Sequence, residues 1–143
     1  MSSDRKYFLK TIGASNWLLD DDWINARPEL LKEVRTPKRP SGISRGDFFV
    51  FYATGHQKIF AIAKSKINGA DAELRATAEE SRWPYVIPIQ VFLAIPQLPL
   101  APDWGVMDIA PETITQKSYV EITRASYKAA WEALTDRTKP EPK

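Results

Sequence analysis

The chain has 143 residues, of which 43% are hydrophobic and 27% are charged, and its formal net charge is +2. These proportions are typical of a globular chain and exclude a disordered or fibrous one. The absence of cysteine excludes disulfides and sulfur metal sites, and a single histidine, His56, cannot form a histidine cluster. We therefore expect one domain over residues 1–143, ordered over about 6–135 with a polar tail at 136–143, and neither metal nor cofactor.

Neither the polar N-terminus nor the longest apolar stretch, Tyr85 to Leu100, predicts a membrane segment, since Pro88, Pro96 and Pro99 interrupt that stretch. A cytoplasmic location is the resulting expectation. The weak positive net charge leaves room for a local basic surface.

The first part of the chain predicts one strand and two helical pieces. The strand covers Tyr7 to Leu9 and ends near Lys10 and Thr11, before Gly13. Ser15 can cap a helix through Trp17 and Leu19, and Pro28 is placed to begin a second helical piece over Glu29 to Val34.

The middle of the chain predicts a β-hairpin. Ser44 to Asp47 is a turn before an aromatic strand, Phe48 to Tyr52, and Gly55 and His56 form the next turn. The alternating segment from Ile59 to Ile67 is the partner strand.

The last part predicts a long strand and a terminal helix. Ala72 to Glu80 is either helical or an ordered loop, and the strand from Tyr85 to Ile95 must place Pro88 at a sheet edge or a bulge. Tyr119 to Ile122 is extended and precedes a helix capped by Thr123 or Ser126, followed by a frayed polar tail from Thr135. The buried face of this helix is predicted from Tyr127, Trp131 and Leu134.

These elements predict an α+β domain, with a mixed sheet or small barrel and peripheral helices. Phosphate loops, nucleophile elbows and histidine metal motifs are absent from the sequence, which favours ligand binding over catalysis.

The order and spacing of four segments are characteristic of one known family: Lys6–Thr11, Ile43–Tyr52, Arg82–Ile89 and Ser118–Thr123. Through them the chain resembles the EVE domain of the PUA-like superfamily, which is related to YTH domains. The resemblance implies a curled mixed sheet or small open barrel, and an aromatic pocket for one flipped-out, often modified base, approached from a basic surface.

Trp83 is the expected pocket wall, because a tryptophan between Arg82 and Pro84 in a polar context differs from one inside an apolar run. An extruded base needs π-surfaces on its faces. Either Trp23 or Arg35 is expected to form the opposing wall of the pocket. Trp17 is expected in the core.

The resemblance further implies that Lys10, Thr11 and Asn16 make polar contacts to the base. Tyr52 and Tyr85 complete the expected pocket. Phosphate contacts are expected from the basic loop, at Arg35, Lys38 and Arg39.

The leading hypothesis is therefore a non-catalytic reader of a modified base, such as 5-methylcytosine or N6-methyladenine, in DNA or RNA. One alternative is a small hydrolase of modified nucleosides, as in the related ASCH branch, using Lys10 and Thr11 with a carboxylate from Glu73, Glu79 or Glu80. Another is a protein-interaction module whose aromatics all lie in the core. The modified base, the choice of DNA or RNA and the oligomeric state stay open.

Overall fold

The computed structural model describes residues 5–12, 19–74, 84–109 and 119–138. Its strands are β1 (Tyr7–Ile12), β2 (Glu33–Thr36), β3 (Phe48–Ala53), β4 (Lys58–Ser65), β5 (Glu73–Leu74), β6 (Tyr85–Ala94) and β7 (Tyr119–Ile122). Its α-helices are α1 (Trp23–Ala26) and α2 (Arg124–Thr138), and its 3-10 helices are η1 (Pro28–Leu31), η2 (Gly69–Asp71), η3 (Leu98–Leu100) and η4 (Trp104–Met107).

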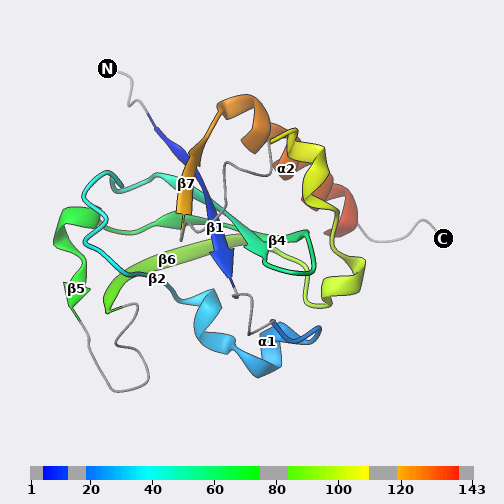
Figure 1. Cartoon of the computed structure of the whole chain (residues 1–143), viewed down its shortest axis with the longest axis horizontal. Helices are drawn as coiled ribbons and strands as arrows, with labels where there is room; N and C mark the ends of the chain where they lie inside the picture. Colours follow the sequence, from blue (N-terminus) through cyan, green and yellow to red (C-terminus); the bar gives the residue numbers. More distant parts are fainter. Residues whose placement is uncertain (1–4, 13–18, 75–83, 110–118, 139–143) are drawn as a thin grey trace.

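The strands form one mixed sheet in the order β2-β6-β4-β3-β1-β7, and β5 also pairs with β6 (Figure 1). β1 and β3 are parallel, whereas the other paired strands are antiparallel. The predicted hairpin is confirmed, since β3 and β4 are neighbours joined by a short turn. The α+β class with a mixed sheet is confirmed as well.

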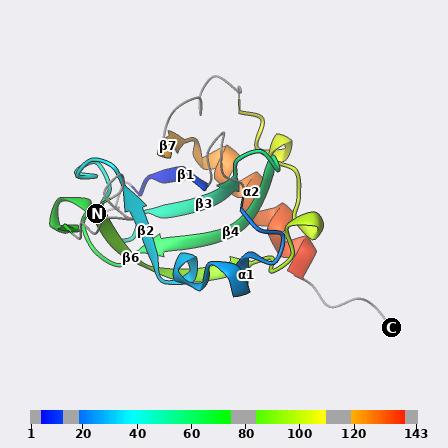
Figure 2. The ribbon, with the colours of Figure 1, turned by 60° about the horizontal axis from the view of Figure 1, so that its bottom comes forward.

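The sheet curls, with α2 along one side and α1 and β2 toward the other (Figure 2). The pairing shifts register between Phe51 and Tyr52 in β3 and between Ile62 and Ala63 in β4. Such irregularities increase local twist and bend a sheet. α2 packs on β1, β4 and β6, whereas η1 packs on β2 and β6. Six of the eight residues of the central strand β4 are buried, so both of its faces are covered.

Pro88 lies inside the sheet rather than at its edge. It is in register with Glu33 of β2, at the point where β6 passes from pairing with β5 to pairing with β4. The amide of Ile89 points to β2 and donates to the carbonyl of Lys32 at 2.9 Å. Because successive amides of a strand point to opposite sides, the nitrogen of Pro88 points away from β2, and this ladder loses no hydrogen bond. The expected bulge is elsewhere, opposite Ile62 and Ala63.

The second predicted helical piece, Glu29 to Val34, is wrong beyond its first turn. η1 ends at Leu31, and Val34 belongs to β2, where it is buried in register with Ile87 of β6. The 3.6-residue pattern of Leu30, Leu31 and Val34 is too short to decide the matter, and pairing with β6 overrides local helix preference.

At the C-terminus the helix cap is confirmed and the tail is corrected. The amide of Ser126 donates to Oγ1 of Thr123 at 3.0 Å, so Thr123 caps α2. The helix continues to Thr138, beyond the predicted start of the tail at Thr135.

Two other predicted elements lie partly outside the described residues. The first predicted helix begins at Ser15, residues 13–18 are not described, and α1 begins only at Trp23. Within Ala72 to Glu80, the described Glu73 and Leu74 form β5, and residues 75–80 are not described.

The turn before β3 is fixed by the buried carboxylate of Asp47, which accepts the amides of Lys6 at 3.0 Å and Ser44 at 2.8 Å. Gly46 has a φ of 93°, which only glycine adopts readily, so the predicted turn is confirmed. Asp47 thereby ties the start of β1 to the start of β3.

Replacing Asp47 by Ala should lower the free energy of unfolding by about 2–3 kcal/mol, because two amides lose a charged acceptor. Asp47→Asn keeps one acceptor oxygen and should lose about half as much. Urea denaturation measures both, and the exposed Arg45→Ala in the same turn is the control. Equal stability of Asp47→Ala and Arg45→Ala would contradict this role.

Candidate nucleic-acid interface

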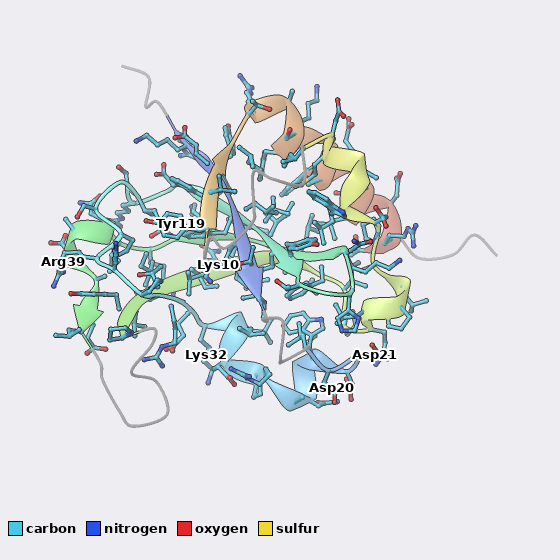
Figure 3. The ribbon with its side chains drawn as sticks, viewed as in Figure 1. Lys10, Asp20, Asp21, Lys32, Arg39 and Tyr119 are labelled. Carbon is cyan, nitrogen blue, oxygen red and sulfur yellow. The ribbon has the colours of Figure 1, made fainter. Side chains whose placement is uncertain are left out.

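Lys10 is a buried lysine on β1, with only 5% of its surface exposed. Its Nζ donates to the carbonyl of Thr11 at 3.0 Å. Phe51 on β3 and Tyr119 on β7 are its partners in the two adjacent strands, so aromatic residues flank it on both sides. Lys10 and Tyr119 are seen together near the centre of Figure 3.

Burial changes the chemistry of this amine. Removal from water lowers the pKa of Lys10 from 10.5 to about 7. Near neutral pH the amine therefore interconverts between a charged donor and a neutral group that can also accept a hydrogen bond. Burial also raises the pKa of Tyr119, which keeps its hydroxyl neutral.

Tyr119 was not predicted as a site residue. The sequence places it only in a short extended segment, and no motif marks it. It reaches Lys10 because β7 pairs antiparallel with β1, with Tyr119 opposite Lys10 and its ring 5.7 Å from that of Phe8. A pairing between strands more than 100 positions apart leaves no signal in a single sequence.

Trp23 is a core residue in this structure. It is 0% exposed, its Nε1 donates to the carbonyl of Ile95 at 2.7 Å, and its ring meets Phe60 edge-on at 4.8 Å. A tryptophan whose ring and nitrogen are both engaged has no free face for a base. The structure therefore offers no support for Trp23 as the second pocket wall.

Tyr52 is also largely buried, with 6% exposure, and its ring packs 5.4 Å from that of Trp104. Burial and the neighbouring Asp103 raise its pKa. On β3 it is in register with Thr11 of β1, which is half-buried, so two of the predicted pocket residues are neighbours.

Arg39 and Tyr85 are brought together at the start of β6. The Arg39 guanidinium lies 4.9 Å from the centre of the Tyr85 ring, and its Nη1 donates to the carbonyls of Ala70 and Ala72. Tyr85 is the first residue of β6, in register with Thr36. The guanidinium and the ring together form a basic, aromatic surface, and Tyr85 follows Trp83 by two positions in the sequence. Arg39 is seen at the margin of Figure 3, beside β5.

The other two predicted phosphate contacts differ from each other. Arg35 is half-buried on β2 and its Nη1 lies 3.4 Å from the carboxylate of Glu33, so part of its charge is already compensated. Lys38 is exposed just beyond β2, and its backbone carbonyl accepts the hydroxyl of Thr36. Lys38 and Arg39 are both exposed, whereas Arg35 is half-buried, so Lys38 and Arg39 are the more accessible to an added phosphate.

Trp83 and Asn16 lie outside the described residues, as do Glu79 and Glu80. Glu73 is described and lines a shallow groove of about 290 Å³ with Lys32, Glu33 and Asp71, among others. Lys10 does not line that groove.

Among the described residues, no helix is long and apolar enough to cross a membrane. The same part of the chain contains no group of three or more metal-ligating side chains.

Comparison with solved structures identifies this arrangement of strands and helices. The YTH domain of Mmi1 superposes with a TM-score of 0.64 at 10% identity, over 94% of this chain and 78% of that one. The chain has the fold of the YTH domains. The YTH domain of Zygosaccharomyces rouxii MRB1, determined in complex with N6-methyladenosine RNA, gives 0.60 at 8% identity over 92% and 87% of the two chains.

A protein from Agrobacterium tumefaciens, Atu2648, gives a TM-score of 0.54 at 17% identity and covers 96% of both chains. No family model matches the chain, and no curated protein matches it. At these identities the likeness establishes the fold alone, and the predicted curled mixed sheet with peripheral helices is confirmed with it.

Proposed function

We propose that this protein is an EVE-type reader that binds a modified base of a nucleic acid in a pocket formed at the Lys10 end of β1. The observation that carries the proposal is the fold shared with YTH domains, one of which was determined with N6-methyladenosine RNA. Two features of the described structure support it: the buried amine of Lys10, whose partners in the adjacent strands are Phe51 and Tyr119, and the Arg39–Tyr85 pair.

These features have different roles in the proposed binding. Lys10, with a pKa of about 7, can donate to a base carbonyl or accept from an exocyclic amine, depending on its protonation. Trp83 would stack on the base, and Thr11 and Asn16 would hydrogen-bond its edge. Lys38 and Arg39 would bind backbone phosphates, which makes the affinity depend on salt.

A nucleoside hydrolase is the second candidate, because a buried amine with a pKa of about 7 is suited to act as a general base. The carboxylate that it needs would come from Glu79 or Glu80, since Glu73 lines a groove that does not include Lys10. Release of free base from modified nucleosides, abolished in Lys10→Met, would favour this function over the reader.

Replacing Trp83 by Ala should weaken binding of the preferred modified oligonucleotide by roughly tenfold or more, because stacking contributes about 1–3 kcal/mol per base. Fluorescence anisotropy at two salt concentrations measures this. The probes are single-stranded DNA and RNA with 5-methylcytosine, N6-methyladenine or no modification. The expected preference for one modified probe disappears in the variant.

Trp131→Ala is the matched control, since Trp131 is on α2 and its loss should leave this affinity unchanged. Equal affinity of the wild-type protein for modified and unmodified probes would refute the reader, and so would an unaltered preference in Trp83→Ala.

A further inference from the structure

A groove of about 710 Å³ lies between α2 and the sheet, and Lys10 is not among the residues that line it. Its floor is aromatic: Tyr7 from β1, Phe48 from β3, Phe92 from β6, and Tyr127 and Trp131 from α2. Phe92 is 40% exposed and Trp131 36% exposed. Exposed aromatic side chains gathered in one groove indicate an interaction site.

The margin of this aromatic groove is basic. Arg124 and Lys128 of α2 line it and are exposed, and no carboxylate of the described residues lies within salt-bridge distance of either. Arg5 lies 5.6 Å from the centre of the Phe48 ring, and Lys64 lies 5.5 Å from that of Phe92. None of the described residues that line the groove is acidic, so its charge is complementary to an acidic partner.

Several of the ring faces in this groove are already covered. Tyr7 stacks on Phe48 at 5.9 Å and on Tyr127 at 4.4 Å, while the cations of Arg5 and Lys64 cover faces of Phe48 and Phe92. A nucleic acid needs free ring faces for its bases, and it brings polar base edges that need partners. An apolar side chain needs only the mostly carbon floor that the groove provides.

We propose that the aromatic groove binds an acidic segment of a partner protein, whose apolar side chains enter between α2 and the sheet while its carboxylates pair with the basic margin. This interaction goes beyond base reading and uses none of the residues assigned to it. The protein would then hold a nucleic acid on one surface and a protein on another.

The probe for this proposal is a fluorescein-labelled peptide in which Asp and Glu flank a Leu-Phe-Trp centre. The intact chain should bind it, and binding should weaken with added salt. Phe92→Ser and Lys128→Glu should each reduce the affinity about tenfold or more, since anchors and desolvated charges dominate such interfaces. Circular dichroism confirms that both variants remain folded.

Two matched variants lie outside the groove. Leu100→Ser removes a 62% exposed apolar side chain, and Lys32→Glu reverses an exposed charge on another part of the molecule. Both should bind the peptide as the wild type does. A peptide with Ser in place of its apolar centre, and one with Lys in place of its acids, should not bind.

The proposal is overturned if the acidic apolar peptide does not bind, or if Phe92→Ser and Lys128→Glu bind it as the control variants do. It is equally overturned if an unmodified single-stranded oligonucleotide binds instead and loses affinity in those two variants. The last result would assign the groove to nucleic acid.

Discussion

Replacing Trp23 by Ala is expected to lower the free energy of unfolding by about 3–5 kcal/mol, the usual loss for a large aromatic side chain in a core. The ring is fully buried against Phe60, and its Nε1–H donates a hydrogen bond to the carbonyl of Ile95, just beyond β6. Both the packing and the hydrogen bond are lost together. Thermal or urea denaturation measures the change.

Trp23→Phe separates the two contributions, because it keeps most of the ring and removes the donor. It should lose less stability than Trp23→Ala, with part of the loss arising from the unpaired Ile95 carbonyl. The exposed Trp131→Ala should change stability far less than either. A Trp23→Ala variant that keeps wild-type stability but loses oligonucleotide binding would contradict the core role and restore Trp23 as a pocket wall.

Replacing Lys10 by Met is expected to stabilise the protein most at or below pH 7. The fall in the pKa of Lys10 from 10.5 to about 7 means that folding buries a charge below pH 7, at a cost of roughly 5 kcal/mol. Methionine has a similar length and no charge, so the cost disappears. Packing losses around the Thr11 carbonyl will reduce the gain.

The pH dependence distinguishes this effect from ordinary repacking. Between pH 7 and 10.5 the unfolded chain keeps the Lys10 proton while the folded chain releases it, so wild-type stability rises with pH. The slope from this group is about 1.4 kcal/mol per pH unit, and it is absent in Lys10→Met. The difference between the two proteins should therefore shrink steadily from pH 7 to pH 9.5.

Urea denaturation of both proteins across that range gives the measurement, and working below pH 10 avoids tyrosine titration. Lys38→Met, which removes an exposed lysine, should leave the pH profile parallel to that of the wild type. Parallel profiles for Lys10→Met as well would show that the Lys10 amine stays charged in the folded protein.

Much of the fold follows from local pattern. The aromatic strand after Asp47, the alternating strand after it, and the extended segment before the Thr123 cap were all predicted correctly, because each carries its own turn or capping residues. The segment around Val34 was predicted wrongly, since a short apolar pattern fits a helix turn and a buried strand equally well.

For the candidate site the sequence by itself determined which residue types were present: a lysine and a threonine at the end of the first strand, a tryptophan in a polar context, and a basic loop. Tertiary structure decided what those residues do. The burial of Lys10 beside Tyr119, the enclosure of Trp23 by Phe60 and Ile95, and the stacking of Arg39 on Tyr85 each join segments distant in sequence. Burial and pKa depend on such long-range packing, which a single sequence does not encode in any local pattern.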